Sequence, residues 1–433
     1  MNQIYSKINK PIKAVIEVPG DKSISQRILI IASLSIGTTV IKNISESEDV
    51  QNLIKNLKSL GVKISKENNK TIIKGVGIGG FMPPKKTLYM GNSGTATRLM
   101  LGAMCNQDYK IKFIGDKSLS GRNMSKLIQP LKKMGAIINS KKNKLPITIK
   151  GFNETMPIFY NQKVPSAQIK SAILLASLNS PGLTTIIENT PTRDHTEILL
   201  KKAGAKLKIK KFNQKKSIKI IGQKELISNN IEIGGDPSAA AIIGSAALIV
   251  PKSEIKIKKV NINKTRITFF DILKKMNGNI RFINKRIVSG EKIGDVIFKT
   301  SKLKGISLGK EVVSNMIDEI PIFCILACFA NGKSSFSGGS ELRNKESNRI
   351  NSLFKGLKQF GINVKKINDG LEINPIGIAN INKDISVKSY HDHRIAMAFL
   401  IMGVISRKKV IIDDTKCINT SFPNFITLMK KLV

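Results

Sequence analysis

Eight of the eleven arginines in this chain lie in or beside short motifs rich in Gly, Ser, Asp and Asn. They are Arg27, Arg98, Arg122, Arg193, Arg266, Arg343, Arg349 and Arg394. Lysine and arginine together number 72, so most of the basic residues are lysines. In such a lysine-rich chain, arginine indicates positions that need a planar bidentate donor for phosphate or carboxylate. The motifs therefore predict a site for a multiply charged anion.

Six polar motifs lead directly into a strongly apolar run of helix length, and they recur every 70 to 80 residues. They begin at Gly20, Gly91, Pro165, Gly235, Asn315 and His391. The N-terminus of a helix is a natural anion site because its free N–H groups and its dipole present positive charge. Six such helices in one chain could surround a highly charged small molecule.

Each repeat has a second part, an amphipathic helix that ends near a glycine and is followed by a β-prone run. These segments are 49–64, 124–138, 196–209, 267–280 and 346–364, and their glycines are Gly61, Gly135, Gly204, Gly278 and Gly361. Each repeat is therefore expected to be β-α-β-α-β-β, and the last keeps only the helix PNFITLMKKLV. A helix that is apolar all round belongs in the middle of a domain. We expect two closed lobes of three repeats each, because these helices are too apolar for the alternative, a thin solenoid.

The net charge of +42 raises the question of a nucleic-acid partner. The lysines, however, are spread along the whole chain, Trp is absent and Tyr numbers 5, so aromatic platforms for bases are scarce. We expect a solvated lysine surface that steers anions inward, and no nucleic-acid partner. The alternative, a nucleic-acid-binding module, predicts salt-sensitive retention of RNA or DNA.

Several features bear on location and on metal binding. The first residues, MNQIYSKINKPIK, lack an apolar segment, and the longest apolar run, 239–250, is too short for a bilayer, so we expect a cytoplasmic protein without a membrane partner. Cys324 and Cys328 stand one helical turn apart in an apolar run, which is typical of core residues. The pair His391 and His393 lacks a third ligand, so no metal is expected.

The glycine-rich segment GVGIGG at 75–80 matches the G-x-G-x-x-G pattern of dinucleotide-binding proteins. It is followed by FMPPKK and not by a helix, so it fails the structural context of that pattern. We interpret it as a glycine turn and expect no cofactor.

Ten motifs occur in an order that resembles the 5-enolpyruvylshikimate-3-phosphate synthase family. They are GDKSISQR, GNSGTATR, GDKSLSGR, SAQIK, RDHTE, NKTR, MIDEIP, LRNKESNR, DHRIAMA and TSFP. The SAQIK, RDHTE and NKTR forms look like its class II subgroup. The resemblance implies an α/β fold of two lobes, each an inside-out α/β barrel with three buried parallel helices. It places residues 1–20 and 231–433 in one lobe, residues 21–230 in the other, and the active site in the cleft between them.

The reaction implied by the resemblance moves the carboxyvinyl group of phosphoenolpyruvate to the 5-hydroxyl of 3-phosphoshikimate. It releases phosphate, and it belongs to the shikimate pathway to chorismate and the aromatic amino acids. The resemblance implies small-molecule substrates, a monomer and no cofactor. A rival within the enolpyruvyl transferases acts on UDP-N-acetylglucosamine and carries a reactive cysteine in a loop that corresponds to GDKSLSGR, which has none.

The family's motifs assign roles to particular residues. The residues expected to bind 3-phosphoshikimate are Lys22, Ser23, Arg27, Ser166, Ala167, Gln168, Arg193, Asp318 and Lys345. Those expected to bind phosphoenolpyruvate are Lys22, Gly94, Arg122, Gln168, Arg349 and Arg394. The catalytic set is Asp318 as general base, Glu346 as proton shuttle to the methylene carbon, and Lys22 assisting departure of phosphate.

Structural alternatives stay open for some of these residues. Asp318 could be a helix N-cap, and Glu346 could be an exposed helix charge. Arg98 and Arg343 are expected to hold neighbouring carboxylates and loops. Some family members have a lysine at the position of Thr420, so its role is absent here or is taken by another cation. The small residue Gly94 leaves room for glyphosate, so the resemblance predicts inhibition by that compound.

Overall fold

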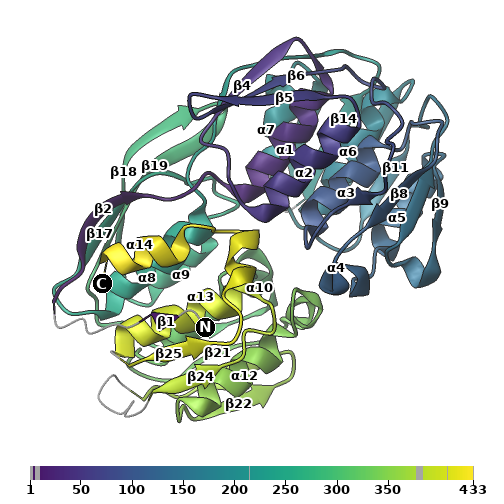
Figure 1. Ribbon diagram of the computed structural model, residues 1–433. Coiled ribbons are helices and arrows are strands. Elements are labelled where there is room, and N and C mark those ends of the chain that lie inside the picture. Colours follow the sequence, from purple (N-terminus) through teal and green to yellow (C-terminus); the bar gives the residue numbers. More distant parts are fainter. Residues whose placement is uncertain (1–2, 5–9, 214, 377–383, 407, 433) are drawn as a thin grey trace. The chain divides into compact units, whose positions relative to one another are not determined.

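The computed structural model describes residues 3–4, 10–213, 215–376, 384–406 and 408–432 (Figure 1). The chain divides into two compact units. Unit 1 comprises Met1–Pro19, Gly234–Ile287 and Lys292–Val433, and unit 2 comprises Gly20–Ile233 and Val288–Glu291. The crossing near residue 233 lies three residues beyond the boundary expected at 230, because Ile231 and Glu232 pair with a strand of unit 2.

Each unit has three buried helices, and each follows one of the six polar motifs. In unit 2 they are α1 (Lys22–Ser33), α3 (Gly94–Ala103) and α6 (Ala167–Ala176). In unit 1 they are α8 (Pro237–Ile249), α11 (Ile320–Ala327) and α13 (His393–Ser406). Every residue of α8, α11 and α13 is buried, which confirms that these runs form the middle of a domain.

The polar motifs before α1, α3, α6 and α8 each supply a side chain that caps the helix. Asp21 accepts a hydrogen bond from the Ile24 N–H, and Ser93 accepts one from the Ala96 N–H. Ser166 and Asp236 cap α6 and α8 in the same way. A polar residue at this position satisfies one of the four N–H groups that a helix leaves unpaired at its start.

Amphipathic helices cover the buried ones. They are α2 (Glu48–Ser59), α5 (Ser125–Lys133), α7 (His195–Lys202), α9 (Thr268–Lys275), α12 (Arg349–Gln359) and α14 (Phe425–Leu432), with shorter α4 (Lys117–Gly121) and α10 (Lys310–Asn315). Four of the five expected glycine stops have a positive φ, at Gly61, Gly135, Gly204 and Gly361. At Gly278 the helix α9 stops and a strand follows, as predicted, but the left-handed residue is Asn277, with φ 67°.

Four-stranded sheets enclose the helices of each unit. Within a sheet, the four strands of a repeat lie side by side in the order first, second, fourth, third. Those of unit 2 are β16 (Ile231–Glu232), β4 (Thr38–Lys42), β6 (Lys70–Lys74), β5 (Lys63–Glu67); β7 (Leu88–Tyr89), β8 (Ile111–Ile114), β10 (Ile147–Lys150), β9 (Ile137–Ser140); and β11 (Phe159–Gln162), β12 (Leu183–Glu188), β14 (Lys215–Ile221), β13 (Lys206–Phe212). A two-stranded pair joins β15 (Leu226–Ile227) to β3 (Ser35–Ile36).

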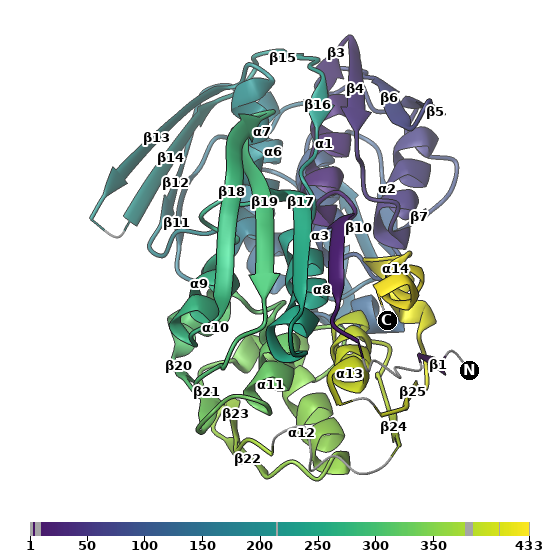
Figure 2. The same cartoon turned by 90° about the vertical axis from the view of Figure 1, so that its left-hand side faces the viewer.

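Unit 1 has two such sheets and a smaller third. They are β2 (Lys13–Glu17), β17 (Glu254–Asn261), β19 (Glu291–Lys299), β18 (Asn279–Val288); β20 (Ser307–Leu308), β21 (Ser334–Phe336), β23 (Gly370–Ile373), β22 (Val364–Ile367); and β1 (Gln3–Ile4), β25 (Val410–Ile412), β24 (Ile385–Val387). Figure 2 shows β18, β19, β17 and β2 side by side.

The repeats are not contiguous in the chain, because two of them exchange their first strands. The strand β2 precedes α1 but pairs in parallel with β17 of unit 1. The strand β16 precedes α8 but pairs in parallel with β4 of unit 2. The chain therefore completes both sheets only by crossing between the units. The β-α-β-α-β-β pattern is present, but its first strand comes from another part of the sequence in these two repeats.

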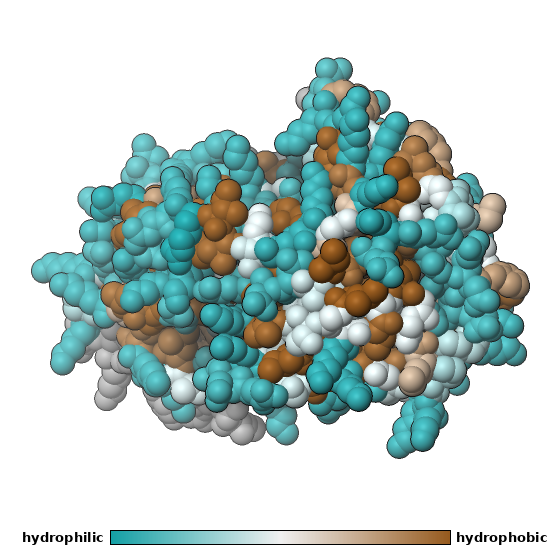
Figure 3. Space-filling model, turned by 90° about the horizontal axis from the view of Figure 1, so that it is seen from above, coloured by the Kyte–Doolittle hydropathy of each residue, from teal (hydrophilic) through white to brown (hydrophobic). Residues whose placement is uncertain are grey.

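The face of the molecule in Figure 3 is covered mainly by hydrophilic residues, with hydrophobic ones in separated patches. Among the described residues, no helix is both long and apolar enough to cross a membrane. The four cysteines are all unpaired and buried, and Cys324 and Cys328 lie in the core of unit 1, as predicted.

Candidate active site

In unit 2 the first turns of α1, α3 and α6 lie together at one end of the helical core. Gln26 of α1 donates to the Oγ of Ser93, which caps α3, over 2.7 Å. Gln168 in the first turn of α6 donates to Thr95 Oγ1 over 2.9 Å. Arg98 connects the same two helices, since its Nη1 lies 2.9 Å from both Gly94 O and Gln168 Oε1. Three helix N-termini therefore present their partial positive charges at one place.

The residues of GDKSISQR lie on the first turns of α1. The Lys22 ammonium donates to Asp49 Oδ2 over 3.0 Å, and Lys22 keeps 20% of its side chain exposed. Arg27 is buried, and its Nη1 donates to Ser23 O and Ser23 Oγ. Asp49 was not predicted. Its position in the first turn of α2, two residues after the N-cap residue Ser47, is the signal in the sequence that could have indicated it.

Arg122 follows α4 and reaches back toward the start of α3. Its Nη2 donates to Asn92 Oδ1 over 2.6 Å and to Ser118 Oγ over 3.2 Å. A Cβ atom built on Gly94 would lie 3.1 Å from Arg122 Nη1 and 2.7 Å from Arg98 Nη1. A side chain at this position would therefore press on two guanidinium groups, which would have to shift from the positions they occupy beside the glycine.

Ser166 and Ala167 form the start of α6, and Arg193 lies on the loop before α7. Ser166 is the N-cap residue, so its hydroxyl is engaged by the Ile169 N–H at 3.3 Å. Arg193 is partly buried. The predicted residues of unit 2 thus gather around the N-termini of α1, α3, α6 and α7.

In unit 1 the predicted acids share one buried arginine. Arg349 Nη2 donates to Glu346 Oε2 over 2.8 Å, and Arg349 Nη1 lies 3.5 Å from Asp318 Oδ1. Its Nε donates to Asp392 Oδ2 over 2.9 Å, and Asp392 is completely buried. Burial opposes the charge of Arg349, but the three carboxylates outweigh it and raise the pKa of its guanidinium above the ordinary value.

The structure decides the alternatives for the two acids. Glu319, not Asp318, is the N-cap residue of α11, so the N-cap interpretation of Asp318 is wrong. Glu346 precedes α12, and its side chain is 16% exposed and paired with Arg349, so it is not an exposed helix charge. Asp392 was missed as a partner of Arg349, although it belongs to the DHRIAMA motif.

Lys345 lies beside the same acids and is partly buried. Burial, aided by the positive charge of Arg349 and opposed by Asp318 and Glu346, lowers the pKa of its ammonium group below the ordinary value. A lysine of this kind exchanges its proton more readily than a solvated one.

Arg394 stands in the first turn of α13. Its backbone N–H donates to Asp392 Oδ1 over 2.9 Å, and the residue is 7% exposed. The Nε atom is buried and has no hydrogen-bond partner among the described residues. A buried guanidinium nitrogen without a partner is costly, so this position favours an anionic ligand.

The remaining predictions concern Thr420, the histidine pair and Arg343. Thr420 Oγ1 lies 3.2 Å from His393 Nδ1, so a neutral side chain stands at the position where some family members have a lysine. His391 Nδ1 lies 2.7 Å from Asp414 Oδ2. In the part of the chain that the structure describes, no group of three or more His, Cys, Asp or Glu side chains could hold a metal ion. Arg343 pairs with Asp369 at 3.0 Å, which confirms its structural role.

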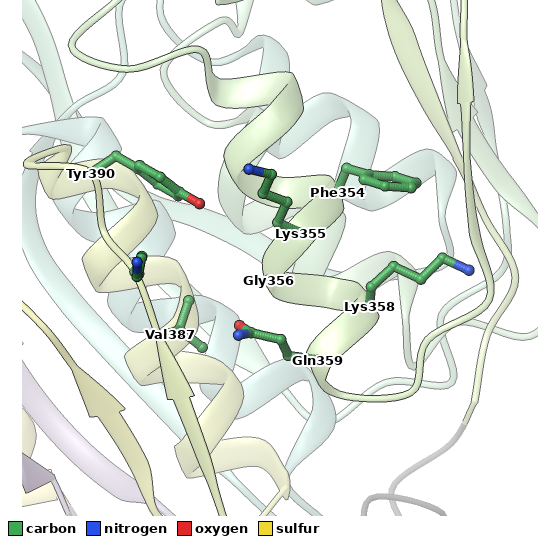
Figure 4. Close-up of a pocket in the computed structure, with 8 residues that line it drawn as sticks. Phe354, Lys355, Gly356, Lys358, Gln359, Val387 and Tyr390 are labelled. Atoms are coloured by element: carbon green, nitrogen blue, oxygen red, sulfur yellow. The ribbon is translucent and has the colours of Figure 1, made fainter.

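A hollow of about 390 Å³ lies between α12 and the segment around β24 (Figure 4). Phe354, Lys355, Lys388 and Tyr390 are among the residues that line it. It includes none of the predicted site residues. We therefore place the candidate site at the helix N-termini and not in this hollow.

Comparison with known proteins agrees with the motifs over nearly the whole chain. Residues 6–429 match the family model of EPSP synthase (3-phosphoshikimate 1-carboxyvinyltransferase). The chain is 42% identical to the 3-phosphoshikimate 1-carboxyvinyltransferase of Zymomonas mobilis, with 99% of this chain and 96% of that protein covered. It is 43% identical to the enzyme of the same name from Bartonella henselae, covering 97% and 96%.

Solved structures give the same result. The EPSP synthase of Acinetobacter baumannii superposes with a TM-score of 0.86 and 36% identity, covering 99% of this chain and 97% of that one. The enolpyruvyl transferase NikO from Streptomyces tendae shares the fold, with a TM-score of 0.77 and 12% identity, over 99% of this chain and 96% of that one. The fold is accordingly the two-domain, inside-out α/β fold. On its sequence and its fold, the chain belongs to the EPSP synthase (3-phosphoshikimate 1-carboxyvinyltransferase) family.

Proposed function

We propose that this protein transfers the carboxyvinyl group of phosphoenolpyruvate to the 5-hydroxyl of 3-phosphoshikimate, giving 5-O-(1-carboxyvinyl)-3-phosphoshikimate and phosphate. The observation that carries the assignment to particular residues is the pair of acids on Arg349. The reaction must remove a proton from the attacking hydroxyl and deliver one to the vinyl methylene. Asp318 and Glu346 supply two carboxyl groups at the same guanidinium, so both proton transfers can occur at one place.

In the addition step, Asp318 accepts the proton of the 5-hydroxyl while the hydroxyl oxygen bonds to the central carbon of phosphoenolpyruvate. Glu346 gives a proton to the methylene carbon, which becomes a methyl group. In the elimination step the bond from the central carbon to the phosphate oxygen breaks, and Glu346 takes back the proton from the methyl group. The departing phosphate, which Lys22 stabilises, receives the proton that Asp318 took from the hydroxyl. Each step balances without an oxidant, a reductant or a cofactor.

Binding of the substrates is assigned to the cations at the helix N-termini. Arg27, with Ser23 and the start of α6, holds the phosphate of 3-phosphoshikimate, and Arg193 and Lys345 contribute further charge. Arg122 and Arg394 hold phosphoenolpyruvate. Arg349 also binds it, once one of the carboxylates paired with Arg349 gives way to the substrate. The buried, unpartnered Nε of Arg394 supports this role. We propose that residues of both units act on the same pair of substrates.

A phosphate-release assay with the purified protein tests the function. Phosphate should appear with both substrates together and not when either is omitted. Asp318→Ala should lower kcat by orders of magnitude while binding of 3-phosphoshikimate is largely kept, because the base acts in the chemical step. Turnover without 3-phosphoshikimate, or normal turnover by Asp318→Ala, would contradict the assignment.

The rival reaction with UDP-N-acetylglucosamine has less support. The loop from Gly115 to Arg122 has no cysteine, and all four cysteines of the chain are buried. We propose further that the protein is a monomer, works in the cytoplasm and binds neither nucleic acid nor membranes. Sedimentation of the purified protein tests the first point, and retention on RNA or DNA at physiological salt would refute the absence of a nucleic-acid partner.

A further inference from the structure

The guanidinium group of Arg27 is held at its Nε atom by a residue of another helix. Arg27 Nε donates to Thr196 Oγ1 over 2.9 Å, and both side chains are buried. Thr196 lies on α7, which packs against both α1, the helix of Arg27, and α6, the helix of Ser171; Figure 1 shows α1 and α7 next to each other. Since a guanidinium group is rigid and planar, holding Nε in place also sets the direction of its two terminal nitrogens.

The hydrogen bonds beyond Thr196 form a chain whose direction can be assigned. Thr196 Oγ1 lies 2.6 Å from Ser171 Oγ, and Ser171 Oγ lies 2.6 Å from the carbonyl oxygen of Ala167. A carbonyl only accepts and a guanidinium only donates. The Ser171 proton therefore goes to Ala167, the Thr196 proton goes to Ser171, and Thr196 accepts from Arg27. This relay connects the arginine of α1 to the first residue of α6.

Buried charged residues hold the first turn of α7, which carries Thr196, in position. Glu197, the next residue, lies 2.8 Å from Lys170 Nζ of α6 and 2.9 Å from Lys216 Nζ of β14. Lys170 also lies 3.0 Å from Glu188, which accepts a hydrogen bond from the Thr192 N–H in the loop before α7. Burial opposes the charge of Glu197, but the two lysines outweigh it and lower the pKa of its carboxyl group. The four charges balance, so the network can stay ionised inside the core.

We infer that Thr196 is a positioning residue for 3-phosphoshikimate. It aims Arg27 at the sugar phosphate and couples that arginine to the start of α6, where Ser166, Ala167 and Gln168 bind the same substrate. This inference rests on the proposed function. None of the motif assignments gives Thr196 a role, and its buried hydroxyl is engaged by Arg27 and Ser171.

The test compares Thr196→Val with Thr196→Ser in the full-length protein. Valine keeps the shape of threonine but removes the acceptor, so the KM for 3-phosphoshikimate should rise about tenfold, the loss expected for a hydrogen bond to a charged group. The KM for phosphoenolpyruvate should change little, because Arg27 does not bind that substrate. Thr196→Ser keeps the hydroxyl and should restore the KM for 3-phosphoshikimate.

Thr155→Val is the matched control. Thr155 is also buried in unit 2, and its hydroxyl lies 2.7 Å from both Ala176 O and Ser180 Oγ, at the C-terminal end of α6. It should lower the melting temperature without raising either KM. Equal effects of the two valine substitutions on the KM for 3-phosphoshikimate, or no effect of Thr196→Val in an active enzyme, would overturn the inference. An inactive wild-type enzyme would instead refute the proposed function.

Discussion

The buried arginine of unit 1 offers a quantitative test of the site's electrostatics. Arg349 has 1% of its side chain exposed and Asp392 has none, whereas Glu346 and Asp318 keep 16% and 25%. Replacing Arg349 by Met leaves the Asp392 carboxylate buried without a countercharge, which costs roughly 3–5 kcal/mol. The other two acids can turn to water and add little. The predicted loss is therefore a large share of a typical unfolding free energy of about 5–15 kcal/mol.

Urea unfolding followed by circular dichroism measures this loss, with separate transitions fitted if the two units unfold separately. The unit 1 transition should move to lower urea concentration, and the unit 2 transition should not. A second substitution, Asp392→Asn, should recover about half of the loss in the Arg349→Met background, because it removes the uncompensated charge. The asparagine carbonyl can still accept from the Arg394 N–H.

Arg343→Met provides the matched control within the same unit. Arg343 pairs with Asp369 at 3.0 Å, but the two side chains are 43% and 42% exposed. Loss of such a pair costs about 1 kcal/mol or less. If Arg349→Met were no more destabilising than Arg343→Met, the reasoning that burial sets the cost of the lost charge would be refuted.

Two further predictions concern substrate binding. Gly94→Ala should raise the KM for phosphoenolpyruvate about tenfold, because the added Cβ would press on Arg98, 2.7 Å away, and on Arg122, 3.1 Å away, and weaken a charge-assisted hydrogen bond to the substrate. An unchanged KM would contradict this. Because the pKa of Lys345 is lowered from 10.5, its ammonium group loses its proton at a lower pH than a solvated lysine does. The KM for 3-phosphoshikimate should therefore rise as the pH is raised through the pKa of Lys345. Lys345→Arg, which stays charged, should abolish the rise, and identical pH profiles of the two enzymes would argue against the role of Lys345.

The buried helices and the clustering of motifs could be predicted from the sequence because both depend on local patterns. An apolar run preceded by a capping Asp or Ser specifies where a helix starts, as Asp21 and Ser93 show. The exchange of β2 and β16 could not be predicted from local patterns. Only the family resemblance assigns residues 1–20 to the lobe of residues 231–433, and it assigns β16 to that lobe as well, whereas β16 belongs to unit 2. Both strands precede a buried helix in the same way, and the choice of a pairing partner far along the chain leaves no local pattern.

The same limit applies within the site. Asp318 and Glu319 are adjacent acids before one helix, and the sequence does not say which of them caps it; the backbone turn decides for Glu319. Asp392 is a residue of a recognised motif, yet its pairing with Arg349 depends on α12 and α13 packing together. Residue type predicted the chemistry available, whereas tertiary packing determined which groups meet.

The presence of an arginine in a motif does not by itself show that it binds an anionic ligand, so its contacts in the structure must also be considered. Arg343 and Arg349 are both engaged by carboxylates, and buried lysines such as Lys170 occur in this chain when glutamates surround them. Arg394 differs, because its Nε is buried at a helix N-terminus with no hydrogen-bond partner among the described residues. A guanidinium nitrogen that folding has desolvated but left without either a hydrogen bond or a carboxylate partner has surroundings that favour an anionic ligand.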